Sequence, residues 1–166
     1  MSIELLKKLG AFALFCLMQV LVLNRIHLFG VATPLLCVYF VMRFRRNYPK
    51  WGLLLWAFFM GLTIDSFSNT PGVTAASLTF MAALQPYLFT PFVARDSAED
   101  VEPAMYQIGF TKYLSYALIM VFIFCLLFFT LEMFSFFNWL YWLECVVGST
   151  VLVTLLIVVM ESVRRA

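Results

Sequence analysis

Charged residues are scarce in this chain of 166 residues: Asp, Glu, Lys and Arg together make up 12% of it. Hydrophobic residues make up 64%, whereas an average soluble domain has roughly 45–50%. A soluble fold of this size leaves roughly a third of its chain surface in water, so it could not hide that much apolar side chain. High hydrophobicity with low charge also excludes intrinsic disorder. The composition therefore predicts an integral membrane protein.

Residues for catalysis or metal binding are few as well. The chain has a single His and four Cys, and it contains no CxxC pair, no G-x-S-x-G, no phosphate loop and no HExxH. Each Cys lies inside an apolar run, which is typical of small buried hydrophobic residues. We therefore expect no enzymatic activity, no cofactor, no metal site and no nucleic-acid partner. The cysteines are Cys16, Cys37, Cys125 and Cys145.

Long apolar runs are abundant instead, and they are continuous. The strands of a transmembrane β-barrel alternate polar and apolar residues, so continuous runs favour helices. A spanning helix needs about 20 residues plus a connection, which leaves room for about six helices and no separate soluble domain. We expect an all-α integral membrane protein, in which residues 1–166 form one six-helix transmembrane domain. The expected spans are 5–23, 28–42, 51–64, 73–93, 113–131 and 139–160.

Basic residues fall almost entirely on one side of these six spans. Of the 11 Lys and Arg residues, only Arg25 falls on the side opposite to the two termini. Cytoplasmic loops carry the excess of Lys and Arg in membrane proteins. The pattern therefore predicts a multi-pass protein with both termini in the cytoplasm.

One acidic residue stands near the end of the third expected span. A helix from Trp51 to Asp65 rises about 21 Å, whereas the hydrocarbon core is about 30 Å thick. Asp65 is therefore expected at membrane depth, where an ionisable residue usually indicates a functional site. Two interpretations remain open: Asp65 holds a turn as a structural residue, or it has a binding or coupling role.

The residues after Asp65 have the composition of a turn. Asn69, Pro71 and Gly72 supply turn chemistry. We expect Thr70 to cap the fourth helix and Pro71 to occupy its first position. Irregular backbone at this depth is tolerated only where protein or a water-filled cavity surrounds it.

Arg25 lies in the short first connection, at an expected depth similar to that of Asp65. A buried charge is tolerable when it is paired, so we predict an Arg25–Asp65 contact. In the alternative, Arg25 extends outward to the membrane surface on its long side chain.

Small residues recur along one face of the fourth span. Such residues let helix backbones approach closely and drive helix association in lipid. The span is therefore expected to be central in the bundle or to present this face to a partner helix. The residues are Gly72, Ala75, Ala76, Thr79, Ala82 and Ala83.

The stretch 61–72, Gly-Leu-Thr-Ile-Asp-Ser-Phe-Ser-Asn-Thr-Pro-Gly, leads into this small-residue helix and resembles the rod shape-determining MreD family. Segments 23–34, 92–96 and 134–138 look like the version in one branch of that family. Together the segments cover nearly the whole chain. The residues that map to the family pattern are Gly61, Leu62, Asp65, Pro71 and Gly72.

The resemblance implies a non-catalytic component of the bacterial elongation machinery in the inner membrane. Such a protein binds an MreC-like partner, which has one membrane span and a periplasmic domain. It thereby helps link cytoplasmic MreB filaments to RodA and its class B penicillin-binding protein. The family is also similar in fold to the six-helix substrate-binding subunits of energy-coupling-factor transporters. A vitamin-binding subunit of such a transporter is therefore the alternative function.

Overall fold

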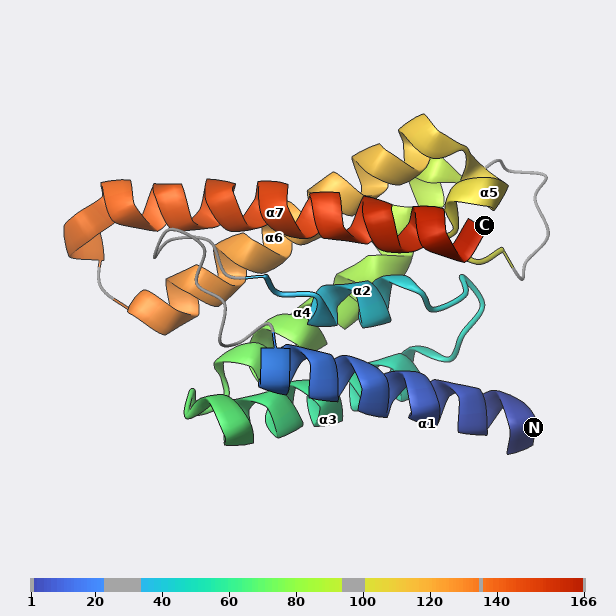
Figure 1. The fold of residues 1–166 in the computed structure, drawn as a ribbon, viewed down its shortest axis with the longest axis horizontal. Coiled ribbons are helices and arrows are strands. Elements are labelled where there is room, and N and C mark those ends of the chain that lie inside the picture. Colours follow the sequence, from blue (N-terminus) through green and yellow to red (C-terminus); the bar gives the residue numbers. More distant parts are fainter. Residues whose placement is uncertain (1, 23–33, 94–100, 135, 166) are drawn as a thin grey trace.

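The computed structural model of the chain describes residues 2–22, 34–93, 101–134 and 136–165, and these residues form helices without any β strand (Figure 1). The longer helices are α1 (Ser2–Leu17), continued by a π-helical turn (Met18–Val22), α3 (Lys50–Ser68), α4 (Val73–Phe89), α6 (Phe110–Met133) and α7 (Trp139–Arg165). The short elements are α2 (Cys37–Met42), α5 (Met105–Ile108) and two 3-10 turns, Thr90–Phe92 and Phe136–Asn138.

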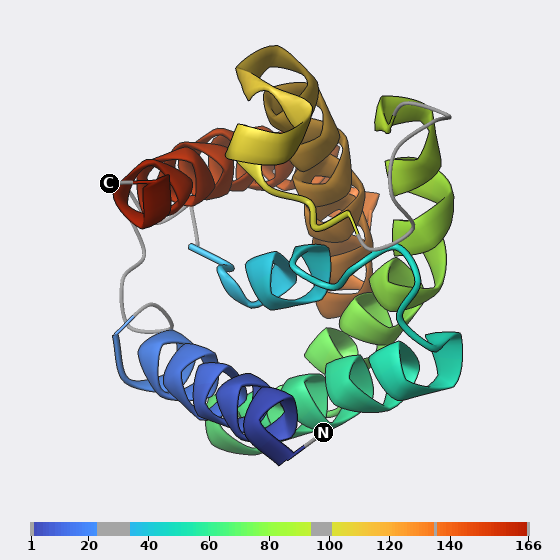
Figure 2. The same ribbon diagram turned by 90° about the vertical axis from the view of Figure 1, so that its right-hand side faces the viewer.

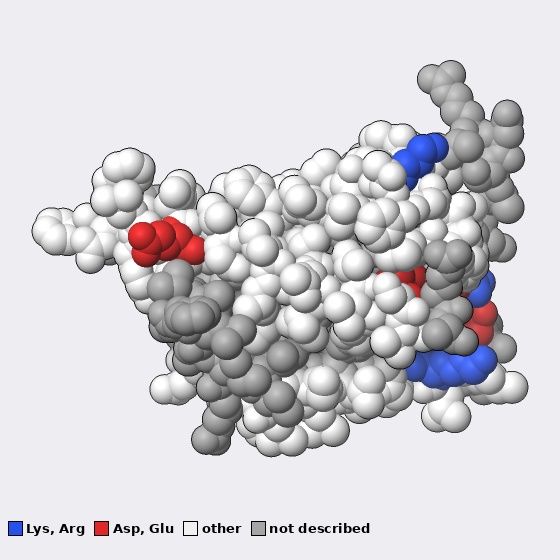
Figure 3. Space-filling view, turned by 45° about the horizontal axis from the view of Figure 1, so that its top comes forward, with Lys and Arg blue, Asp and Glu red and all other residues white. Residues whose placement is uncertain are grey.

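Three of the described helices, α3, α6 and α7, are long and apolar enough to cross a membrane. Figure 3 shows a broad uncharged band on one face of the molecule, with the charged side chains towards its two ends. The N and C marks lie at the same end, which we call the charged end, and the turn between α3 and α4 lies at the opposite end (Figure 1). The protein is therefore an all-helical membrane protein with three candidate spanning helices.

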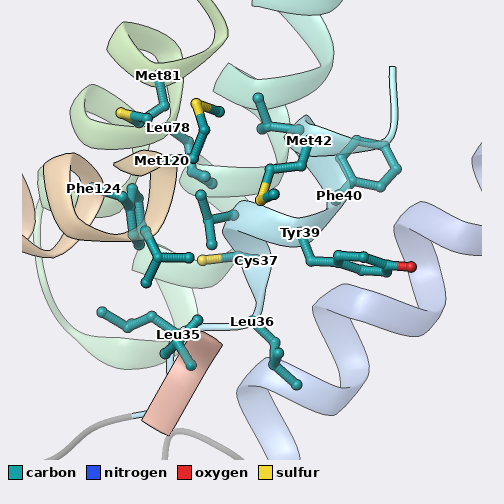
Figure 4. Close-up of a cluster of buried hydrophobic side chains, with 14 of the residues drawn as sticks. Leu35, Leu36, Cys37, Tyr39, Phe40, Met42, Leu78, Met81, Met120 and Phe124 are labelled. Carbon is teal, nitrogen blue, oxygen red and sulfur yellow. The ribbon is translucent and has the colours of Figure 1, made fainter. Parts of the chain in front are cut away.

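The short helix α2 lies inside a ring formed by the longer helices (Figure 2). All six residues of α2 are buried. Side chains of α4 and α6 pack against one side of α2, while Tyr39 points away from them towards α1 (Figure 4). Tyr39 packs there on Phe15 of α1, with 5.6 Å between the ring centroids. The labelled side chains from α4 and α6 are Leu78, Met81, Met120 and Phe124.

The expected second span, 28–42, differs from the structure. Its described residues, 34–42, are α-helical only from Cys37 to Met42, while residues 23–33, which include Arg25, lie outside the described residues. Proline in a helix interior removes a hydrogen bond and clashes with the preceding turn, so Pro34 disfavours one continuous helix over 28–42. The described residues of the other five expected spans are helical except for Val93, and several helices extend further than expected.

The expected third span, 51–64, also ends too early, because α3 continues to Ser68. Asn69 ends the helix in the left-handed conformation, with φ 59°, and Asn is among the few non-glycine residues that adopt this conformation readily. The sequence 66–68 was expected to be irregular, but its backbone is helical.

α3 and α4 pack against each other at very short range near Gly61. A Cβ atom built on Gly61 would lie 2.6 Å from the backbone nitrogen of Ala75. No side chain fits there unless the two helices move apart. Gly61 therefore sets the spacing of this helix pair.

Replacing Gly61 by Ala should lower the free energy of unfolding by about 1–3 kcal/mol, the usual cost of overpacking a well-packed contact. Thermal unfolding of the detergent-purified protein measures this effect. Gly10→Ala is the matched control, because nothing lies within 4 Å of a Cβ atom at Gly10. Equal unfolding temperatures for the two variants would contradict the role of Gly61.

Candidate functional site

The carboxylate of Asp65 lies at the start of α4. Its Oδ1 atom accepts hydrogen bonds from the backbone N–H of Thr74 at 3.0 Å and from the hydroxyl of Thr70 at 3.0 Å. Its Oδ2 atom accepts a hydrogen bond from the backbone N–H of Ala75 at 2.9 Å. The side chain is buried, so these three bonds replace the water that the carboxylate would otherwise bind.

Asp65 thus caps a helix that it does not belong to. Thr74 and Ala75 are the second and third residues of α4, and N–H groups at these positions have no partner within a helix. A capping side chain usually comes from the residue just before the helix, but that residue is Gly72, which has none. The carboxylate arrives from α3 instead, and its negative charge favours the positive end of the α4 dipole.

The prediction that Thr70 caps α4 and that Pro71 begins it was wrong. The helix begins at Val73, and the Thr70 hydroxyl donates to Asp65 rather than accepting from the helix. Gly72 has φ 80°, a value at which a residue without Cβ avoids strain. The turn is therefore the four residues 69–72, and Asp65 holds it from outside.

The predicted partner of Asp65, Arg25, lies outside the described residues. Within the described part of the chain, both Asp65 oxygens bind groups of the turn and of α4. A coupling role for Asp65 therefore stays a prediction, and it would act through the position of α4.

An apolar groove of about 980 Å³ lies beside this turn, along α3 and α4. One end is lined by Asp65, Asn69, Pro71 and Gly72, and the α3 wall reaches back to Leu54. From Leu54 to Asn69 the α3 side of the groove extends about 22 Å. The groove is also lined by Phe58, Leu62, Ser66, Ala75, Ala76, Thr79, Phe80 and Ala83; this set with the five residues above defines the α3–α4 groove.

The small residues of α4 face in two directions. Ala75 and Ala82 are buried inside the protein. Ala76 and Ala83 are exposed and Thr79 is half-buried, and these three line the α3–α4 groove. One part of the small-residue face therefore packs within the molecule, and the other part is open at its surface.

Glu161 is also buried, although it was not among the predicted site residues. Its Oε2 atom accepts a hydrogen bond from the Tyr39 hydroxyl at 2.6 Å, and its Oε1 atom accepts one from the backbone N–H of Met105 at 3.2 Å. Arg164 lies one turn further along α7, with 4.0 Å between its Nη1 atom and Oε1. An acidic residue directly after the apolar run 151–160 was the available signal.

Two buried glutamines, which were not predicted either, donate hydrogen bonds to the backbone on either side of α2. The side-chain amide of Gln19 donates to the carbonyl of Pro34 at 3.1 Å, and that of Gln85 donates to the carbonyl of Phe44 at 3.1 Å. Both carbonyls flank the short helix, where helical hydrogen bonds end. The signal in the sequence was an amide side chain inside an apolar run.

At the charged end, Glu102 joins two distant segments. It accepts a hydrogen bond from Arg45 Nε at 2.9 Å and one from Arg164 Nη2 at 3.2 Å. Burial by itself raises the pKa of Glu102, but the hydrogen bonds from these two arginines and their positive charges outweigh it. The pKa of Glu102 is therefore held below its ordinary value.

No protein-family model, curated protein or solved structure matches the chain. The four cysteines are buried free thiols. Among the residues that the structure describes, no three His, Cys, Asp or Glu side chains are grouped so as to hold a metal ion. The described site is thus a capped turn beside an apolar groove, an arrangement that can bind an apolar surface.

Asp65→Leu should destabilise the protein strongly, because three donors lose their acceptor. Asp65→Asn should be intermediate, since the Asn oxygen can keep the bonds to Thr70 and Thr74, while its NH₂ group faces the N–H of Ala75. Each buried donor left without a partner costs about 1–3 kcal/mol. Thermal unfolding should rank wild type above Asn and Asn above Leu.

Ser66→Ala is the control for this series, because the exposed Ser66 hydroxyl bonds only within α3, to the Leu62 carbonyl. It should change stability by less than about 0.5 kcal/mol. Wild-type stability of Asp65→Leu would rule out the capping role.

The ion pairs of Glu102 should make stability depend on pH. Because the pKa of Glu102 is lower in the folded protein than in the unfolded chain, the pairs stabilise fully above the unfolded value. This stabilisation is lost as the pH falls through the lower, folded value. Glu102→Gln should therefore lower the unfolding temperature at neutral pH and converge with wild type in acid.

Unfolding temperatures across the acidic range measure this difference. A constant offset between Glu102→Gln and wild type across this range would show that its ion pairs do not stabilise the folded state.

Proposed function

We propose that this protein is a non-catalytic, MreD-like adaptor of the bacterial cell-elongation complex. In this role it binds an MreC-like protein in the inner membrane. Through that partner it couples MreB filaments to RodA and its class B penicillin-binding protein. The proposal includes six spans and cytoplasmic termini, which rest on the apolar runs and on the distribution of basic residues.

The observation that supports this function best is the α3–α4 groove. Its length of about 22 Å along α3 covers much of a hydrocarbon core about 30 Å thick. Ala76, Thr79 and Ala83 provide small side chains, over which a partner helix can approach closely. An MreC-like partner contributes one spanning helix, and the α3–α4 groove has the length and the apolar lining to hold one helix.

Large apolar side chains beside the small ones would enclose such a helix. Phe58, Leu62 and Phe80 all line the groove and are 42%, 46% and 50% exposed. Helices associate in lipid through close van der Waals packing rather than through a hydrophobic driving force. A groove with small residues between bulky ones provides that packing.

Asp65 acts in this proposal as a positioning residue. By capping α4 from α3, it fixes the spacing of the two groove walls at the end where the helices turn. Of the five residues that map to the family pattern, Gly61, Asp65, Pro71 and Gly72 lie at the close approach or the turn of this helix pair, and Leu62 lines the groove. The resemblance and the groove therefore support the same surface.

The alternative is a vitamin-binding subunit of an energy-coupling-factor transporter, with its ligand in the same groove. Small-molecule sites combine an apolar lining with a few polar groups that fix orientation. In the α3–α4 groove the carboxylate of Asp65 already binds three protein donors, which favours a helix over a small polar ligand. Native mass spectrometry that finds a bound vitamin would favour the alternative.

Filling the groove tests the adaptor function. Ala76→Trp and Ala83→Trp each place a bulky ring where the partner helix would pack, and recovery of an MreC-like protein should fall at least about tenfold, as for a lost interface hot spot. Cells carrying either variant should lose rod shape. Recovery is measured by co-purification from membranes, with the variant at wild-type abundance.

Leu118→Trp is the control, because Leu118 is 49% exposed on α6 and does not line the groove. It should leave partner recovery and cell shape unchanged. Normal recovery with a filled groove would contradict the groove as the docking site. Normal shape after depletion of the protein, with no MreC-like partner recovered, would contradict the adaptor function.

A further inference from the structure

A second pocket, of about 510 Å³, opens at the charged end of the molecule. It lies between α1, the end of α2 with the turn 43–49, Glu102 and the last turn of α7 at Arg164. We call it the charged-end pocket. Segments from four parts of the chain meet there, so it forms only in the folded protein.

The charged-end pocket has an excess of positive charge. Its two acidic residues are already paired: Glu102 binds Arg45 and Arg164, and Glu4 lies 3.8 Å from Arg45. Basic side chains thus outnumber acidic ones by three. The charged lining consists of Glu4, Lys7, Lys8, Arg43, Arg45, Glu102 and Arg164.

The three remaining cations are Lys7, Lys8 and Arg43. None of them forms a salt bridge with any residue in the described part of the chain. Lys8 instead lies over aromatic rings, with its Nζ atom 3.9 Å from the ring centroid of Tyr48 and 5.7 Å from that of Phe44. A cation–π contact orients an ammonium group but leaves its charge uncompensated.

The uncharged part of the lining is mostly apolar. Ala11, Phe40, Phe44 and Pro49 form the apolar wall, and Asn47 and Tyr48 complete the lining. A small inorganic anion would need only the cations, whereas a phosphate ester that carries hydrocarbon would contact both parts. Figure 3 shows charged side chains at the ends of the uncharged band, and lipid headgroups meet a membrane protein at such ends.

We propose that the charged-end pocket binds the phosphate of an anionic glycerophospholipid. Lys7, Lys8 and Arg43 contact the phosphate oxygens, because Lys and Arg are the usual donors to phosphate. The apolar wall contacts the glycerol and the first acyl carbons. Basic pockets between helices at the membrane surface bind anionic headgroups in this way.

The test uses the full chain in nanodiscs that contain phosphatidylglycerol and phosphatidylcholine, with native mass spectrometry of the lipids that remain bound after release. Wild type should retain phosphatidylglycerol over phosphatidylcholine. The triple variant Lys7→Gln/Lys8→Gln/Arg43→Gln should reduce this preference at least about tenfold, since each cation near an anionic surface adds several-fold to affinity. The single variants Lys7→Gln and Lys8→Gln should each reduce the preference by a smaller factor. They provide the test if the triple variant does not fold.

The matched control is Arg46→Gln/Lys50→Gln/Lys112→Gln. It removes the same charge from residues that do not line the pocket, so it should keep the wild-type preference. An equal loss in both triple variants would overturn the proposal, because net charge alone would then explain retention. Equal retention of the two lipids by wild type would also overturn it.

A third arm separates the two sources of phosphate. Inorganic phosphate is added to delipidated protein in detergent, and binding is followed by calorimetry. Weak phosphate binding, together with selective lipid retention, supports the lipid. Phosphate binding that depends on Lys7, Lys8 and Arg43, without retention of phosphatidylglycerol, would overturn the lipid assignment in favour of a soluble phosphate.

Discussion

Asp65 accepts hydrogen bonds from two backbone N–H groups at the start of α4, and the α3–α4 pair depends on this contact. A backbone N–H group without a hydrogen-bond acceptor in an apolar environment costs several kcal/mol. The helix α4 can therefore begin at Val73 only because an acceptor reaches its first N–H groups. The acceptor comes from α3, which ties the end of one helix to the start of the next. Gly61 lets the two backbones come close enough, and the groove walls take their spacing from both residues.

The same constraint explains polar side chains elsewhere in the interior. Gln19 and Gln85 bind carbonyls on either side of α2, and Glu161 binds the N–H that begins α5. In each case a side chain from a distant helix satisfies backbone at the end of a short element. The buried polar side chains therefore lie where backbone groups at the ends of short elements need a hydrogen-bond partner. Apolar side chains fill the rest of the interior.

Much of the helical content could be predicted from the sequence, because a continuous apolar run is a local property. A buried environment for Asp65 was also predictable, since helix rise alone predicts that it lies at membrane depth, and its side chain is buried. Its partners were not, because Gly72 leaves the cap position empty and the acceptor lies seven residues earlier. Tyr39 and Glu161 are 122 residues apart, so no local pattern relates them. The short extent of α2 was not predicted, because the run 28–42 contains no charged residue and hydropathy does not show where a helix begins.

The position of α2 has a consequence for how the protein enters the membrane. Its described helix of six residues rises about 9 Å, far less than the hydrocarbon thickness. The backbone on either side of this helix is bound by Gln19 and Gln85, which lie outside α2. We therefore expect α2 to reach its place only when Gln19 and α4 are already present. The centre of the molecule would then be completed after its periphery.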